Sequence, residues 1–121
     1  MIESAGDKVK SWREDVINAV TDEIQTAGWI APDGPVELRL TFWLRKPPSL
    51  PKRRRTPYTK PDLDKLVRST MDALKIAGAI TDDARVIKLE ASKFYAEPDR
   101  PTGANIDLVD WDVSISVQDE R

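Results

Sequence analysis

Four aspartates stand close to the two ends of one predicted helix. Asp62 and Asp64 lie two positions apart in "KPDLDKLVRSTMDAL", before an apolar pattern at helical spacing, and Asp82 and Asp83 follow that pattern. Inside a helix, Asp62 and Asp64 would point about 200° apart, whereas residues i and i+2 of an extended backbone point the same way. Pro61 favours a helix start near Asp62. The two aspartates can therefore share an ion only if Asp62 precedes the helix or caps it.

These aspartates also have a purely structural interpretation. Asp is a favoured N-cap that contributes about 1 kcal/mol, and a second Asp in the first turn complements the helix dipole. Two adjacent acids before a strand, such as Asp82 and Asp83, suit a turn. If the strand that follows returns beside the start of the helix, however, three carboxylates converge, and their repulsion calls for a divalent cation. The spacing leaves both interpretations open.

Two cations follow within the first turns of the same helix. Arg68 is four residues from Asp64 and from Asp72, so the three side chains can stack as exposed ion pairs. Alternatively, Arg68 and Lys65 stabilise charge on a transferred phosphate. The chain has no Cys and no His, so any hydrolysis must use carboxylates, lysines or a metal-activated water. Carboxylate oxygens suit Mg²⁺ or Mn²⁺.

The most basic part of the chain is residues 45–60, "RKPPSLPKRRRTPYTK". It holds seven Lys/Arg and no acid, so the net charge of −2 divides into +7 for this segment and −9 for the rest. Its prolines exclude regular structure. We interpret it as a loop that attracts polyanions, with a plain linker and a nuclear-targeting signal as alternatives. The candidate DNA-binding residues are Arg45, Lys46, Lys52, Arg53, Arg54, Arg55 and Lys60.

Hydrophobic periodicity predicts the elements that position these residues. Apolar spacings of three and four predict helices over 9–24 and from Leu63 to Leu74, with Gly28 and Gly78 ending them. Alternation of apolar and polar residues predicts a half-buried strand over 36–44.

Two further strands are predicted after the second helix. Alternation predicts one over 87–91 and, after a long turn at 97–103, a last one over 111–117 that carries Trp111. We therefore predict a single domain, residues 1–121, of the α+β class. Its two helices pack on one face of a small, mainly antiparallel, mixed β-sheet.

The composition, 40% hydrophobic and 33% charged over 121 residues, is that of an ordinary globular domain. No apolar run approaches the ~18 residues of a membrane span, and "MIESAGDKVK" lacks the apolar stretch of a signal peptide. We expect a soluble, intracellular protein without a membrane partner.

Residues 60–96, "KPDLDKLVRSTMDALKIAGAITDDARVIKLEASKFYA", resemble the core of the RusA-type Holliday junction resolvases, metal-dependent endodeoxyribonucleases common in bacteriophages and prophages. Four shared features carry the likeness. They are the Asp-Leu-Asp sequence at the helix start, the Asp-Ala-Leu sequence at 72–74, the Asp-Asp-Ala turn before a strand, and the spacing of one helix between the first motif and that turn. It implies that Asp62, Asp64 and Asp83 form a Mg²⁺ site, which Mn²⁺ would also fit, with Asp82 as an auxiliary ligand.

The resemblance also implies a homodimer that resolves four-way and branched DNA junctions by paired phosphodiester hydrolysis, in recombination and repair, in the cytoplasm of a bacterial or phage-infected cell. The basic loop would contact backbone phosphates, and Trp43 or Tyr58 would stack on a base at the branch. Trp12, Trp29 and Trp111 are expected in the core or an interface.

This chain departs from the family pattern at three places. The family usually has Asn where this chain has Lys65, and a catalytic Lys where it has Arg68. The family also opens with a strand before its first helix, whereas here the helical pattern begins within ten residues of Met1. An N-terminal strand is therefore expected to be missing.

Two rival functions use the same residues differently. The first is a non-catalytic DNA-binding accessory module, in which the basic loop would bind DNA and the aspartates would only cap the helix and form the turn. Its DNA binding would not depend on Mg²⁺. The other rival is a different metal-dependent phosphodiesterase, or a nuclease with a Pro-Asp and Glu-x-Lys site. Glu90 and Lys93 stand one residue too far apart for that pattern.

Overall fold

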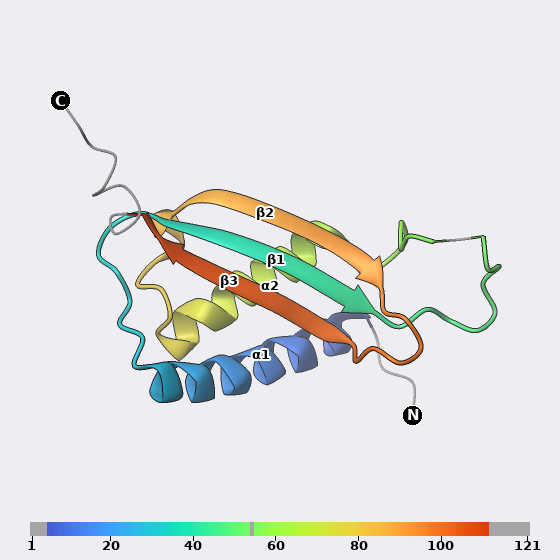
Figure 1. The fold of residues 1–121 in the computed structure, drawn as a ribbon, viewed down its shortest axis with the longest axis horizontal. Coiled ribbons are helices and arrows are strands. Elements are labelled where there is room, and N and C mark those ends of the chain that lie inside the picture. The colour runs from blue at the N-terminus through green and yellow to red at the C-terminus, as the bar shows by residue number, and fades with distance from the viewer. Residues whose placement is uncertain (1–4, 54, 112–121) are drawn as a thin grey trace.

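A computed structural model describes residues 5–53 and 55–111 (Figure 1). The three strands form one sheet in the order β2-β1-β3, with both helices on one face. The α+β prediction is confirmed. The elements are α1 (Ala5–Ala27), β1 (Val36–Leu44), α2 (Leu63–Ala77), the 3₁₀ turn η1 (Asp83–Arg85), β2 (Val86–Tyr95) and β3 (Gly103–Asp110).

The sheet is mixed because its two connections differ. β1 pairs in parallel with β2, and the crossover that a parallel pair requires contains α2. β1 pairs antiparallel with β3, which follows β2 after a short turn. Among the residues that the structure describes, β2 and β3 are therefore the edge strands.

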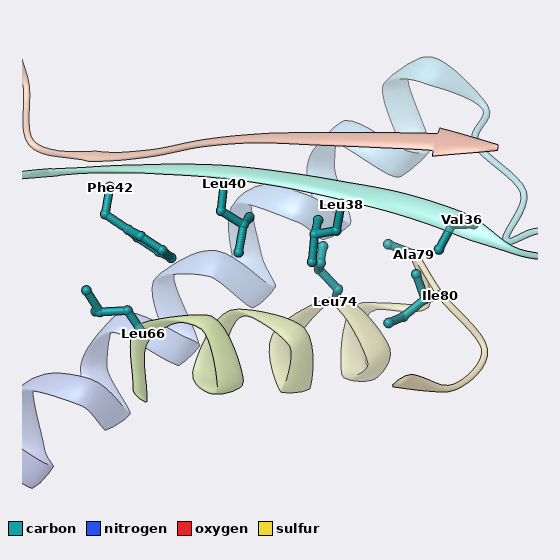
Figure 2. Packing of buried hydrophobic residues seen from close by; sticks show 8 residues of the cluster. All are labelled: Val36, Leu38, Leu40, Phe42, Leu66, Leu74, Ala79 and Ile80. Atoms are coloured by element: carbon teal, nitrogen blue, oxygen red, sulfur yellow. The ribbon is translucent and has the colours of Figure 1, made fainter. Parts of the chain in front are cut away.

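The core lies between β1 and the helices. Alternate residues of β1 point toward the helices and are at most 2% exposed, as Figure 2 shows for Val36, Leu38, Leu40 and Phe42. Leu66 and Leu74 of α2, together with Ala79 and Ile80, meet them there. Trp12, Val20 and Ile24 of α1 pack against the same cluster.

The helices end where the glycines were expected to end them. Gly78 caps α2 in the left-handed region, at φ 87°, which suits a residue without Cβ. Trp12 and Trp29 fix α1 and the chain after it, because Trp12 donates to Thr70 Oγ1 at 3.3 Å and Trp29 to the Ala79 carbonyl at 2.9 Å. In the described part of the chain, no helix has the length and apolar character needed to cross a bilayer.

The third strand differs from its predicted position. We expected it over 111–117, but β3 spans Gly103–Asp110, Trp111 follows it, and 112–117 lie outside the described residues. The reason is an alternation that begins directly after the turn. Ala104, Ile106 and Leu108 pair with the inward positions of β1 and pack against the core.

The other face of the sheet carries a polar network around Glu37. This residue is only 5% exposed, and its two carboxylate oxygens accept hydrogen bonds from Arg39 Nε at 2.6 Å and Trp111 Nε1 at 3.1 Å. These bonds, that from Arg39 first, hold the pKa of Glu37 below its ordinary value. Trp111 thereby joins the end of β3 to the start of β1.

Candidate functional site

Asp62 and Asp64 lie at the start of α2. Asp62 is the N-cap residue with an extended backbone, φ −68° and ψ 141°, and Asp64 stands in the first turn. This is the backbone state that the sequence required if the two carboxylates were to share an ion. Both residues are exposed, and Lys65 Nζ lies 3.9 Å from Asp62 Oδ2.

Helix capping does not account for the Asp62 side chain. Asp62 occupies the N-cap position, yet its carboxylate makes no cap hydrogen bond. Asp82 behaves differently, since its Oδ1 accepts the Ala84 N–H at 3.4 Å and caps η1. Asp82 therefore caps η1, whereas the Asp62 carboxylate makes no such cap and lies 3.9 Å from Lys65 Nζ.

A groove of about 650 Å³ runs between α2 and β2. Its charged lining residues are Asp64, Arg68 and Asp83, and the remaining lining residues are the apolar Leu63, Val67, Met71, Leu89 and Ala91. The groove thus joins two of the three predicted metal ligands to Arg68. Within the described residues Arg68 makes no ion pair with Asp64 or Asp72, so the i, i+4 ion pairs that the spacing allows are absent there.

The three predicted ligands do not converge within one chain. Figure 1 shows that α2 runs back from the end of the sheet where β1 and β2 finish to the end where they begin. Asp64 is in the first turn of α2, whereas Asp83 lies in η1, just before β2. Helix α2 has 15 residues and is about 22 Å long, and the chain reaches Asp83 only after this helix has ended. No group of three carboxylates among the described residues is close enough to hold a metal ion.

The cause is the direction of β2. A strand antiparallel to β1 would have begun beside the start of α2 and brought Asp83 to Asp62. Because β2 is parallel to β1, it begins at the other end of the helix. The Mg²⁺ site accordingly stays a prediction.

Lys93, which the sequence brought up only as part of a Glu-x-Lys pattern that does not fit, has a structural role in this region. Its Nζ donates to the carbonyls of Thr59 at 2.6 Å and Pro61 at 2.8 Å. Lys93 pairs in register with Phe42, so it lies on the helix-facing side of β2. The ammonium group therefore ties the end of the basic loop to the sheet, one residue before Asp62. A lysine at an otherwise inward position of a strand was the available signal.

The basic loop is exposed over most of its length, with Arg54 outside the described residues. Lys46 Nζ donates to the Lys52 carbonyl at 3.3 Å and lies 5.9 Å above the Tyr95 ring. The loop leads into the start of α2, where Asp62 and Lys65 stand (Figure 1).

The two aromatic candidates for base stacking differ in their surroundings. Trp43 already packs against Phe94, with ring centroids 5.5 Å apart, and the Arg100 guanidinium lies 3.9 Å above its ring. Tyr58 is 70% exposed. Tyr58 is therefore the more accessible of the two side chains.

Comparison with known proteins gives the family. No curated protein sequence matches the chain significantly. The family model described as "Endodeoxyribonuclease RusA" matches residues 4–102, which include α1, the basic loop, α2, η1 and β2. That match covers most of the chain and both aspartate pairs, and the chain therefore belongs to the RusA endodeoxyribonuclease family.

Proposed function

We propose that this protein is a Mg²⁺-dependent endodeoxyribonuclease that resolves four-way and branched DNA junctions. Membership of an endodeoxyribonuclease family supports DNA hydrolysis. The observation that carries the proposal is the pair Asp62 and Asp64, exposed at the start of α2 with an extended backbone at Asp62 and no capping bond from its side chain.

The chemistry of the donor set suits the proposed ion. Carboxylate oxygens are ligands that Mg²⁺ and Mn²⁺ prefer, and Asp62 and Asp64 would supply them from one chain. When bound, the ion would supply a Lewis acid for the scissile phosphate and make a nearby water more acidic. Arg68 and Lys65, at the same end of α2, would neutralise charge on the phosphate, the guanidinium by a two-point contact.

We propose that the third ligand comes from a second copy of the chain. In a dimer with a two-fold axis, each contact between the two chains occurs twice. A contact between the Asp64 end of one groove and the Asp83 end of the other groove would therefore form at two equivalent places. If the two grooves pack together antiparallel, the partner subunit's Asp83 lies beside Asp62 and Asp64. By symmetry, Asp83 of the first chain completes the second site. The exposed apolar residues of edge strand β2, Ile87 at 55% and Leu89 at 45%, favour burial in such an interface.

A dimer of this kind has two sites and suits the cutting of two opposed strands of a junction. The seven cations of the basic loop would contact backbone phosphates, which fixes position without reading base sequence. Preference for a junction would then come from the geometry of the dimer. We expect the enzyme to act in the cytoplasm of a bacterial or phage-infected cell.

The test is cleavage of a synthetic four-way junction beside a linear duplex of the same sequence, with Mg²⁺ and with EDTA. We expect cutting of the junction only with Mg²⁺, and we expect Asp64→Asn to bind the junction without cutting it. Asp22→Asn, at an exposed position of α1, removes the same charge and is the matched control. Unchanged cutting by Asp64→Asn would remove the metal assignment. Salt-sensitive binding without any cutting would favour the accessory-module alternative.

A further inference from the structure

A basic hollow of about 670 Å³ lies at the end of the sheet where β1 and β2 finish. Two segments far apart in sequence form it: the basic loop after β1, and the turn that joins β2 to β3. Its lining includes one acid, Glu97, and five cations: Arg45, Lys46, Lys52, Arg55 and Arg100. Within the described residues none of these five makes an ion pair with a carboxylate. Their charge is therefore available to an anion from outside the chain.

Arg100 is the best-oriented of these cations. Its guanidinium carbon lies 3.9 Å above the Trp43 ring, and its backbone N–H donates to the Glu97 carbonyl at 2.8 Å, which closes the turn. Trp43 is held in turn by Phe94. A guanidinium stacked on an indole keeps its in-plane N–H donors directed sideways, where they match two oxygens of one phosphate. Less freedom is lost on binding because the side chain is already held.

The aromatic rings of this region favour an ionic contact over base stacking. Arg100 covers one face of Trp43, and Lys46 lies over Tyr95, which lines the hollow. A nucleobase would have to displace a cation from either ring. The phosphates of a strand, in contrast, would meet these cations directly.

We infer that this hollow is a binding subsite for the phosphodiester backbone of a DNA strand, with Arg100 as its anchoring residue. The inference rests on the proposed function and extends the DNA surface beyond the basic loop to the turn between β2 and β3. The basic loop, which lines the hollow, leads into the start of α2, where Asp62 and Asp64 stand, so a strand bound in the hollow continues toward these aspartates.

The test is binding of a fluorescent four-way junction in EDTA, over a range of salt concentrations, by Arg100→Gln, Arg100→Lys and the unaltered protein. We expect Arg100→Gln to bind about tenfold more weakly at low salt, because a charged hydrogen-bonded contact is lost. The slope of log affinity against log salt should fall by about 0.9. Arg100→Lys should restore the slope but only part of the affinity. Lys75→Gln, exposed at the other end of α2, is the control of equal charge.

The outcomes separate this inference from the proposed function. If Arg100→Gln binds the junction with the same affinity and salt slope as Lys75→Gln, Arg100 does not anchor a phosphate and the subsite inference is wrong. That result leaves the proposed junction cleavage untouched, because cleavage is tested by its own assay. A weaker affinity with an unchanged slope would also overturn it, because a phosphate contact must alter counterion release. If the unaltered protein does not bind the junction, the proposed function and the subsite fall together.

Discussion

Replacing Lys93 by Met tests how the segment before Asp62 is held. Methionine keeps the length and apolar stem of the lysine side chain but removes the two hydrogen bonds from Nζ to the carbonyls of Thr59 and Pro61. A hydrogen bond from a charged group contributes roughly 1.5 to 3 kcal/mol when water is excluded. The bond to Thr59 is exposed and the bond to Pro61 is only partly buried, so both are weakened by solvent. We therefore expect a loss of about 2 kcal/mol for the pair.

The assay is urea unfolding followed by circular dichroism. A loss of this size lowers the midpoint by about 1 to 2 M for a small domain. Lys88→Met is the matched control, because Lys88 stands on the same strand and has a single ion pair in the described structure, at 3.9 Å. It should change stability by at most about 0.5 kcal/mol. Lys93→Arg should restore part of the loss, since a guanidinium can also donate to two carbonyls.

The same change has a functional consequence under the proposed mechanism. Pro61 directly precedes Asp62, so release of this segment should raise the Mg²⁺ concentration needed for half-maximal cleavage more than it lowers the maximal rate. Equal urea midpoints for Lys93→Met and Lys88→Met would refute the argument that Lys93 holds this segment.

Two further predictions concern the fold. Leu38 is fully buried at the centre of the core, so Leu38→Ala should reduce the free energy of unfolding by about 3 to 4 kcal/mol. Ile76→Ala is the control, because Ile76 is 62% exposed and its loss should reduce that free energy by less than about 1 kcal/mol. Equal urea midpoints for the two variants would contradict the packing in Figure 2. The pKa of Glu37 is lowered in the folded state, so its stabilisation is present above pH 4.5 and is lost as the pH falls through the folded-state value. The midpoint difference between the unaltered protein and Glu37→Gln should therefore shrink on acidification, and a difference that is independent of pH would contradict this assignment.

The sequence was most informative where periodicity was strong. The alternation of β1 and the apolar stripe of α2, which ends at Gly78, predicted both elements because each buries one face against the other. The strand at Gly103–Asp110 was missed, although Ala104, Ile106 and Leu108 alternate there with the polar Asn105 and Asp107. A polar outer face is what an exposed sheet surface allows.

The candidate site was predictable only in its local parts. Pro61 indicated a helix start near Asp62, and Asp62 is the N-cap residue of α2. The extended backbone at Asp62 was a condition that the sequence left open. The position of Asp83 relative to Asp62 depended on the direction of β2, which no local pattern encodes. The contacts of Lys93 could not be predicted because its partners are backbone carbonyls more than thirty residues away. Contacts of that kind depend on the tertiary fold.

The central claim is that each metal site is completed by carboxylates from two chains, and mixed dimers test it most directly. Asp64→Asn and Asp83→Asn should each be inactive on the four-way junction as homodimers. Refolded together in equal amounts, they should regain Mg²⁺-dependent nicking at about a quarter of the level of the unaltered protein, because half of the dimers are mixed and each mixed dimer has one complete site of two. If mixed dimers form and bind the junction but nick no strand, the carboxylates do not combine across two chains.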